Sequence, residues 1–449
     1  MKESEIIAKL SEQRDAARQF RSISSKKKNA VLKKAAQLLL ARQDEILKAN
    51  QLDLAALDRA NKSKEKDKKP KDKKKSGSPA FRDRLTLNPK RISQMVESLK
   101  QVVMLSDPVG EIVEENRLKN GLRLKRLRSP LGVIFMIFES RPNVAIEAFS
   151  LAFKAGNGII LRGGRESGKT VNALYGILTD ALASEGIPKS LLWGITDTNR
   201  EIVSFLLKQK KWIDVVVPRG GDSLIEFVVE ESRIPIIKND RGICHVYVHK
   251  DADQAMAAKI IVNAKTQRPG VCNSLETVLI HEAVASKFLP FIYASMDSFG
   301  VRWNLCPKSY SLLSKSRLQS GALSRKGEGK LKIQKATNKS WDTEYLDLEI
   351  NCRIIKSVEE AITHIETHSS KHSDAIITAS PKTAAKFQQE IDSAVVYWNA
   401  STRFTDGFEF GLGGELGIST QKLHVRGPVG LRELTSTRWV VDGQGQTRE

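Results

Sequence analysis

Short apolar runs alternate with helical stretches along most of the chain, and this pattern restricts the fold more than any other feature. After residue 128, the runs "GVIFMIF", "GIIL" and "DVVVP" are separated by segments of helical periodicity such as "VAIEAFSLAFKAG". Strands that are apolar on both faces and alternate with helices form the parallel sheet of a doubly wound α/β domain. The alternation repeats from "HVYVH" to "AVVYWN", near residue 399. A second α/β domain is therefore predicted.

Two further β segments have no place in this alternation. Residues 111–128 contain "EIVEENRL", a "KNG" turn and "LRLKRLRS", whose period-two pattern predicts a β-hairpin. The C-terminal run "LTSTRWVVDG" is also strand-like. Exposed β segments pair readily with another chain. We therefore expect the hairpin and residues 426–449 to form an oligomerisation arm, and the chain to be a homodimer or a larger homo-oligomer.

The formal charge of +21 raises the possibility of nucleic-acid binding. A net +6 of it lies in "KSKEKDKKPKDKKK", within a loop at about 61–79 that we expect to be disordered because it has almost no apolar residues, and the rest is spread over the chain. The basic stretch 314–340 has the same character. Neither stretch interleaves aromatic and basic residues. We expect weak electrostatic attraction to nucleic acids, but no specific nucleic-acid partner.

The chain shows no features of a membrane or secreted protein. It has no run of about 18 apolar residues, the length that crosses a bilayer, and no apolar core of a secretory signal at its start. The four cysteines have neither the spacing of a metal site nor that of a small disulfide framework. We expect a cytoplasmic protein without a bound metal and without a membrane partner.

The stretch "LRGGRESGKT", from Leu161 to Thr170, has the spacing of a phosphate-binding P-loop. An apolar strand precedes it and a helical segment follows, as a P-loop requires. A P-loop enzyme also needs a strand that ends in Asp to hold Mg²⁺, but the strand "VVVP" ends in Pro218. A P-loop nucleotide-binding protein is therefore an alternative interpretation, less favoured than the one below.

Cys272 is the strongest candidate for a nucleophile. In "AKTQRPGVCNSLETVLIH" it follows a helix and a Pro-Gly break and comes just before an apolar strand. Backbone N–H groups at such a turn can lower the pKa of a thiol and stabilise an oxyanion. The alternative is a buried structural cysteine. No local signature of a cysteine protease supports a partner histidine.

Several blocks resemble the γ-glutamyl phosphate reductases, a branch of the aldehyde dehydrogenase superfamily. They are the Cys272 segment, "GVIFMIFESRPNV", "KAGNGIILRGGRES", "DVVVPRGGDSLI", "GICHVYVH" and "WNASTRFTDGFEFGLGGELGISTQKLHVRGPVGL". The resemblance covers nearly the whole chain. It implies an aldehyde-dehydrogenase-like fold with two doubly wound α/β domains and the β arm. The NADP-binding domain would comprise residues 1–110 and 129–237, and the catalytic domain 238–425.

The resemblance also implies the reaction. The Cys272 thiolate would attack L-glutamate 5-phosphate, phosphate would leave, and NADPH would reduce the thioester to the semialdehyde, the second step of proline biosynthesis from glutamate. This deacylation needs no water, and "RGICHVYV" lacks the carboxylate that activates water in hydrolytic relatives. Other acyl-phosphate or aldehyde dehydrogenases of the superfamily remain alternatives. Because the chain has no recognisable amino-acid kinase domain, a separate glutamate 5-kinase is the expected functional partner.

The resemblance assigns the remaining site residues to three groups. The first would bind the cofactor, with two arginines that suit a 2′-phosphate: Arg162, Gly163, Gly164, Arg165, Pro218, Arg219, Gly220, Gly221 and Glu344. The second would bind the substrate: Arg141, Ser401, Thr402 and Arg403. For Arg141, a structural salt bridge is an alternative. The last is Asn143, which would stabilise the oxyanion unless backbone N–H groups around Cys272 do so alone.

Overall fold

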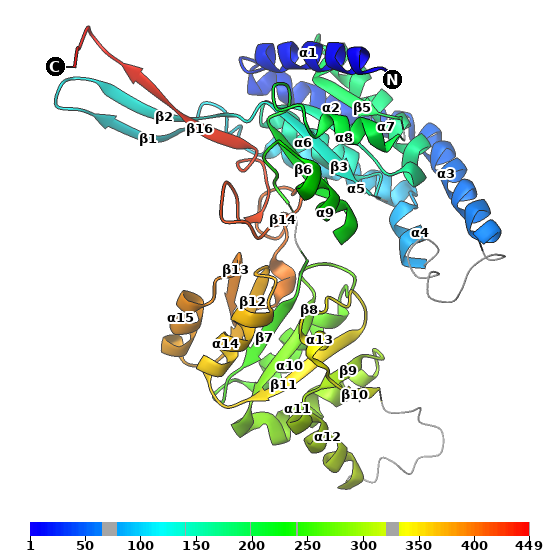
Figure 1. Cartoon of the computed structure of the whole chain (residues 1–449), viewed down its shortest axis with the longest axis vertical. Coiled ribbons are helices and arrows are strands. Elements are labelled where there is room, and N and C mark those ends of the chain that lie inside the picture. Colours follow the sequence, from blue (N-terminus) through cyan, green and yellow to red (C-terminus); the bar gives the residue numbers. More distant parts are fainter. Residues whose placement is uncertain (65–78, 140, 198, 239–240, 320–331, 449) are drawn as a thin grey trace. The chain divides into compact units, whose positions relative to one another are not determined.

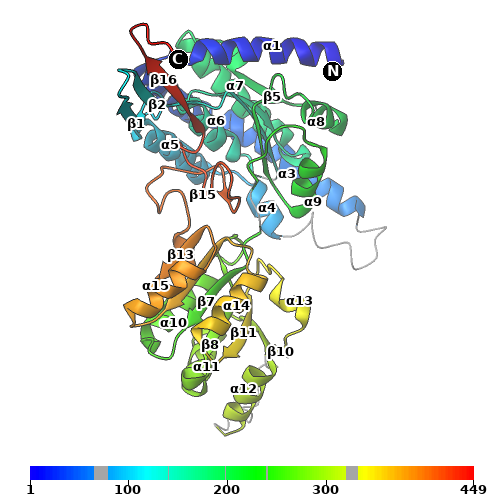
Figure 2. The ribbon, with the colours of Figure 1, turned by 60° about the vertical axis from the view of Figure 1, so that its left-hand side comes forward.

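The computed structural model describes residues 1–448 with gaps at 65–78, 140, 198, 239–240 and 320–331. It has two compact units (Figures 1 and 2). Unit 1 contains Met1–Asn239, Gly411–Gly417 and Pro428–Glu449, and unit 2 contains Asp240–Phe410 and Ile418–Gly427. In the described part of the chain, no helix is long and apolar enough to cross a membrane.

A parallel sheet lies at the centre of unit 1. Its strands are β3 (Val133–Phe138), β4 (Gly158–Arg162), β5 (Leu192–Ile195) and β6 (Val215–Arg219), in the order β5-β4-β3-β6. Every residue of β3 is buried, because helices cover both faces of the sheet (Figure 1). These helices are α1 (Glu3–Phe20), α2 (Ser25–Ala41), α3 (Gln43–Lys64), α4 (Pro79–Leu85), α5 (Pro89–Met104), α6 (Val144–Lys154), α7 (Gly168–Ser184), α8 (Arg200–Leu206) and α9 (Asp222–Glu231).

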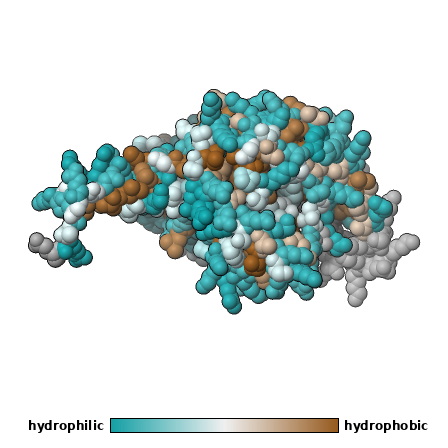
Figure 3. Space-filling view, turned by 90° about the horizontal axis from the view of Figure 1, so that it is seen from above, coloured by the Kyte–Doolittle hydropathy of each residue, from teal (hydrophilic) through white to brown (hydrophobic). Residues whose placement is uncertain are grey.

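A three-stranded antiparallel sheet projects from unit 1 as an arm. Strands β1 (Ile112–Arg117) and β2 (Arg123–Pro130) form the expected hairpin, and β16 (Thr435–Asp442) pairs with β2 on its other side. Trp439 is 50% exposed and Val441 52%. Figure 3 shows hydrophobic residues gathered along this projection. The arm therefore presents apolar side chains and two strand edges to its surroundings.

Unit 2 has a seven-stranded parallel sheet in the order β10-β9-β11-β8-β7-β12-β13. The strands are β7 (Cys244–Val248), β8 (Leu275–His281), β9 (Arg302–Leu305), β10 (Ile333–Lys335), β11 (Glu349–Ile355), β12 (Ser373–Ile377) and β13 (Val395–Trp398). The helices are α10 (Gln254–Thr266), α11 (Glu282–Asp297), α12 (Pro307–Gln319), α13 (Asn338–Trp341), α14 (Val358–His368) and α15 (Pro381–Glu390).

Successive residues of the central strands in unit 2 enter different cores. Val278 packs in the cluster that contains Phe288 of α11, whereas Leu279 packs in the cluster that contains Phe387 of α15. Because neighbouring side chains of a strand point to opposite faces, a strand between two helical layers must be apolar at every position. The run "ETVLIH" meets this requirement from Val278 to Ile280.

The structure differs from the expected boundaries in two places. Residues 411–417, expected in the catalytic domain, belong to unit 1. Arg219 at the end of β6 explains this, because its guanidinium donates to the backbone carbonyls of Glu415 and Leu416, at 3.4 and 3.2 Å. The arm also belongs to unit 1, since β2 continues almost directly into β3.

Both stretches expected to be disordered contain regular structure. α3 extends to Lys64, inside the expected loop at about 61–79, while 65–78 lie outside the described residues. In the stretch 314–340, α12 extends to Gln319 and β10 forms a sheet edge; residues 320–331 lie outside the described ones. Within this stretch, Ile333 of β10 packs against the core. The high positive charge of the surrounding residues hid this contact from sequence analysis.

Candidate active site

Cys272 lies in the loop between α10 and β8, just before the amino end of a central strand. Its side chain is half-buried, whereas the other three cysteines, Cys244, Cys306 and Cys352, are buried; all four are free thiols. Gly242 and Glu344 also precede strands, β7 and β11. The candidate site of unit 2 is therefore at the amino edge of its sheet.

The backbone of Cys272 is held closely by the segment that leads into β7. A Cβ atom on Gly242 would lie 1.5 Å from the Cys272 carbonyl oxygen, so only glycine fits there. The Cys244 thiol donates to the same oxygen, with sulfur and oxygen 3.3 Å apart. Burial raises the pKa of Cys244 well above its usual value, so its proton stays available for this bond. Cys272 is thus held through its main chain.

Glu344 lies next to this contact. Its half-buried carboxylate accepts a hydrogen bond of 2.8 Å from the backbone N–H of Gly242, the residue that touches Cys272. The structure therefore brings together Cys272 and Glu344, which are far apart in the sequence. A carboxylate in this position can also accept hydrogen bonds from the hydroxyl groups of a ribose.

Arg403 also contacts the loop that carries Cys272. It belongs to the short helix η4 (Thr402–Phe404), and its guanidinium donates to the side-chain oxygens of Asn273 and Gln267, the latter at 2.9 Å. Burial, together with the neighbouring Arg268, lowers the pKa of Arg403. An arginine stays protonated despite such a shift. The loop around Cys272 therefore carries a partly desolvated positive charge.

The two residues before Arg403, Ser401 and Thr402, make hydrogen bonds that hold the local structure together. Thr402 is fully buried, and its hydroxyl donates to the backbone carbonyl of Asn273 at 2.8 Å. The Ser401 hydroxyl donates to the Asn263 side chain, also at 2.8 Å. These two hydroxyls thus connect η4 to the loop that carries Cys272 and to α10.

Sequence reasoning missed Arg268, an exposed residue close enough to influence the charge of Arg403. Its place in "TQRPGVC", between the helix and the cysteine, was the available signal.

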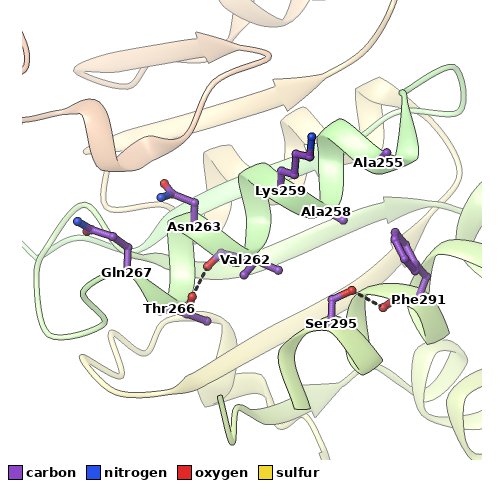
Figure 4. A pocket seen from close by; sticks show the side chains of 9 residues that line it. All are labelled: Ala255, Ala258, Lys259, Val262, Asn263, Thr266, Gln267, Phe291 and Ser295. Atoms are coloured by element: carbon purple, nitrogen blue, oxygen red, sulfur yellow. Dashed lines mark hydrogen bonds between the residues drawn. The ribbon is translucent and has the colours of Figure 1, made fainter. Parts of the chain in front are cut away.

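A groove of about 620 Å³ runs along the outer side of α10 and α11 (Figure 4). Lys259, Asn263 and Gln267 project from α10, and Phe291 and Ser295 from α11, as the figure shows. Asn263 and Gln267 are the partners of Ser401 and Arg403. Cys272 does not line the groove, which therefore adjoins the site only through these two residues.

In unit 1 the candidate residues gather at the carboxyl edge of the sheet. The chain runs from β3 through β4 to β5 on one side and then returns to β6 on the other side of β3. Open α/β sheets bind ligands at such a switch point, beyond the carboxyl ends of the strands. Arg162 ends β4 and Arg219 ends β6. Both cations thus lie where a nucleotide is expected.

Arg162 and Arg165 are the two arginines expected to bind the 2′-phosphate. Arg162 is half-buried, whereas Arg165 is exposed in the following helical turn, η2 (Arg165–Ser167). Burial lowers the pKa of Arg162, an effect that Glu166 opposes and Arg200 strengthens. Arg200 was missed from the sequence. It begins α8, after the four-residue strand β5, which sequence reasoning did not assign.

The glycines beside these arginines are closely packed. A Cβ on Gly163 would lie 3.2 Å from Val171, and one on Gly164 would meet the Glu166 carboxylate at 2.3 Å. In "PRGG", Pro218 is buried, and the Gly221 N–H donates to the Glu139 carboxylate at 3.0 Å. The same carboxylate lies 2.6 Å from a Cβ built on Gly220. A side-chain anion therefore lies at the turn expected to face the pyrophosphate.

Arg141 and Asn143 lie between β3 and α6, and both are half-buried. The Asn143 amide donates to the Glu147 carboxylate at 2.9 Å, and Glu147 in turn pairs with Arg219 at 3.8 Å. An amide NH₂ group has two hydrogens to donate, and this bond uses one. The Asn143 amide thus has a second hydrogen that this bond does not use.

The start of α7 argues against the P-loop interpretation. The Asp53 carboxylate on α3 accepts from the backbone N–H groups of Lys169 and Thr170, at 3.2 and 2.8 Å, and from the Thr170 hydroxyl at 2.6 Å. Asp53 is only 5% exposed. A helix start that carries a buried carboxylate repels a phosphate instead of binding it. "SGKT" therefore begins an ordinary capped helix.

No metal centre is found in the part of the chain that the structure describes: it has no group of three or more His, Cys, Asp or Glu side chains arranged to hold an ion.

Comparison with known proteins gives consistent matches. Residues 87–308 match the aldehyde dehydrogenase family. The chain is 44% identical to the γ-glutamyl phosphate reductase of Clostridium tetani, over 99% of this chain and 98% of that protein. It is also 44% identical to that of Carboxydothermus hydrogenoformans, over 99% of each. The crystal structure of γ-glutamyl phosphate reductase from Thermotoga maritima is 40% identical, covers 99% of both chains and has a TM-score of 0.88.

The cap on α7 leads to a stability prediction. Replacing Asp53 with Ala removes the acceptor for three hydrogen bonds, and we expect the free energy of unfolding of unit 1 to fall by about 1–2 kcal/mol. Urea denaturation followed by circular dichroism measures this. Glu97→Ala, at an exposed position of α5, is the control and should change the free energy by less than about 0.5 kcal/mol. Equal effects of the two variants would contradict the role given to Asp53.

Proposed function

The chain belongs to the γ-glutamyl phosphate reductase family of aldehyde dehydrogenases, and we propose that it reduces L-glutamate 5-phosphate to L-glutamate 5-semialdehyde with NADPH and releases phosphate. The relatives confirm the predicted family and fold. The placement of Cys272 carries the proposal: a half-buried thiol held through its backbone between Gly242 and the Arg403 segment. This reaction is the second step of proline biosynthesis from glutamate.

In the proposed reaction, the Cys272 thiolate attacks the acyl carbon, and the bond from that carbon to the phosphate oxygen breaks. Phosphate leaves with the electron pair, and a thioester remains on Cys272. A bound nicotinamide dinucleotide supplies the hydride that reduces the thioester. The carbon–sulfur bond then breaks, so the semialdehyde leaves and the thiolate is restored.

No general base is required in this scheme, because no water attacks the thioester. The segment from Arg241 to Val248 contains no carboxylate, and at Gly242 no side chain fits beside the Cys272 carbonyl. Glu344 accepts a hydrogen bond from the backbone N–H of Gly242. These features favour reduction of an acyl phosphate over oxidation of an aldehyde to an acid.

Substrate binding is assigned to the cationic residues. Arg403, with its neighbour Arg268, would bind an anionic group of glutamyl phosphate, since guanidinium groups bind phosphate and carboxylate in two-pronged fashion. Arg141 would bind a second anionic group. Ser401 and Thr402 would act by fixing Arg403 in place. Asn143, or the backbone N–H groups around Cys272, would stabilise the oxyanion.

A nicotinamide cofactor fits the carboxyl edge of the sheet in unit 1, where Arg162 and Arg200 provide positive charge. NADPH is proposed over NADH because two guanidinium groups suit the 2′-phosphate. Gly163, Gly164 and the turn from Pro218 to Gly221 would lie along the nucleotide. For the pyrophosphate to bind there, the exposed Glu139 side chain would have to turn away from Gly221. Glu344 would bind the nicotinamide ribose.

We also propose a cellular location and a partner enzyme. All four cysteines are free, which suits a reducing cytoplasm. The acyl phosphate would come from a separate glutamate 5-kinase.

The arm of β1, β2 and β16 is proposed as the site of homo-oligomer formation. Its charged side chains are largely paired within the arm: Lys125 with Asp442 at 2.9 Å, and Arg126 with Glu114 at 3.7 Å. Trp439, with Arg126 over its ring, stays half exposed. Apolar surface and free strand edges are therefore what the arm offers to a second copy.

The first prediction concerns the nucleophile. Cys272→Ser should lower the reverse reaction, phosphate-dependent reduction of NADP⁺ by glutamate semialdehyde, at least roughly a thousandfold, because a serine hydroxyl is not ionised at neutral pH. Absorbance at 340 nm follows the reaction. Cys306→Ser is the control: Cys306 is buried and hydrogen-bonded to Ser309, and this variant should keep an activity close to that of the wild type. Unchanged turnover in Cys272→Ser would exclude the thioester.

The second prediction concerns the cofactor. Arg162→Ala should raise the KM for NADPH by about ten- to a hundredfold, the loss expected for a charged hydrogen bond, and should change the KM for NADH much less. Lys169→Ala is the matched control, because Lys169 is exposed on a helix start already capped by Asp53. An equal rise for NADH and NADPH would contradict a 2′-phosphate contact.

The third prediction concerns assembly. Light scattering coupled to size-exclusion chromatography should give a dimer or a larger oligomer for the wild-type chain. The double variant Trp439→Lys/Val441→Lys should shift the mass towards the monomer, since it places charges on the exposed apolar edge. Leu423→Lys, a similar change at an 88% exposed residue outside the arm, should leave the mass unchanged. A monomeric wild-type chain would refute the proposal.

A further inference from the structure

A fully buried ion pair closes the base of the nucleophile loop. Lys265, in the last turn of α10, donates to the carboxylate of Glu276, the second residue of β8, at 3.0 Å, and both side chains are 0% exposed. Cys272 lies between these two positions in the chain. The pair therefore joins the helix that enters the loop to the strand that leaves it.

Glu276 also contacts the segment that carries Glu344. Its other carboxylate oxygen accepts from the backbone N–H of Leu346 at 3.4 Å. Two residues earlier, Glu344 accepts from Gly242, which touches the Cys272 carbonyl. A continuous series of contacts therefore links the ion pair to Cys272. It runs from Glu276 to the segment of Glu344 and Leu346, and from Glu344 through Gly242 to the Cys272 carbonyl.

The cost of burying both charges makes a contribution to folding stability a poor explanation for the presence of this pair. Burial raises the pKa of Glu276 to about 8 although Lys265 opposes the shift, and burial lowers the pKa of Lys265. The other titratable groups that act on the pair are Glu344, Asp347 and Cys244. Buried ion pairs often contribute less stability than apolar residues of the same size, and some are kept for conformational specificity.

We propose that Lys265 and Glu276 are positioning residues for Cys272. The pair sets the position of the nucleophile loop relative to the Glu344 segment, and neither side chain touches the reacting atoms. The inference rests on the proposed function in one respect, namely that Cys272 is the nucleophile. It goes beyond that function by assigning a role to two residues that the chemistry itself does not use.

The test replaces both partners with apolar residues of similar length, in the full-length double variant Lys265→Met/Glu276→Met. We expect the thermal midpoint to stay close to that of the wild type, because the apolar pair restores packing. The kcat of the reverse reaction should fall by about a hundredfold, the cost of a small misplacement, with a much smaller change in KM. Alkylation of Cys272 by iodoacetamide, measured by peptide mass spectrometry without substrates, should slow by about tenfold.

The matched control is the buried pair Lys28–Asp107 in unit 1, whose charged atoms are 2.8 Å apart. Lys28→Met/Asp107→Leu should keep wild-type kcat and wild-type alkylation of Cys272. If the Lys265/Glu276 double variant folds and both quantities stay at wild-type values, the proposal is wrong.

If that double variant does not fold, Glu276→Gln takes its place. It keeps the shape and the acceptor for Leu346, and wild-type kcat and alkylation in this variant would equally refute the proposal. A wild-type protein without reductase activity would contradict the proposed function, and the alkylation rates alone would then decide this inference.

Discussion

The central strands of both units are buried on both faces, and most of the architecture follows from this constraint. A strand in this environment needs apolar side chains at every position and helices on both sides. β3 meets this requirement throughout its length, whereas β8 is fully buried but includes the polar residues Glu276 and Thr277. Most of the candidate polar residues consequently lie at the ends of strands or in the segments that flank them, where the chain leaves the apolar layers.

The two units use opposite edges of their sheets. In unit 1 the cations Arg162 and Arg219 end strands, as the topology of an open α/β sheet predicts. In unit 2 Cys272, the proposed nucleophile, and its contacts precede strands, at the amino edge. The tight approach of Gly242 to the Cys272 carbonyl is possible there because β7 and β8 are neighbours in the sheet. Backbone contacts of this kind give the thiol a fixed position without a side chain that would compete for the substrate.

Much of this could be predicted from the sequence, where the signal is local. The apolar strands, the hairpin and the turn before Cys272 all carry a periodicity or a breaker residue of their own. β9 and β10 were missed because they are short and partly polar, and they form only by pairing along a sheet edge. Long-range contacts were also invisible. No spacing in the sequence relates Glu344 to Gly242, or Arg268 to Arg403, since the fold alone brings them together.

The cap on α7 has a wider consequence for how sequence motifs are interpreted. Eight consecutive residues, Gly163 to Thr170, match a nucleotide-binding pattern, yet the carboxylate that already occupies the helix start lies 117 positions away, on a different helix. A motif describes the backbone shape of a binding loop, whereas its selectivity depends on the side chains that already contact the backbone N–H groups there. Two chains with identical local patterns can therefore differ in specificity through one distant carboxylate.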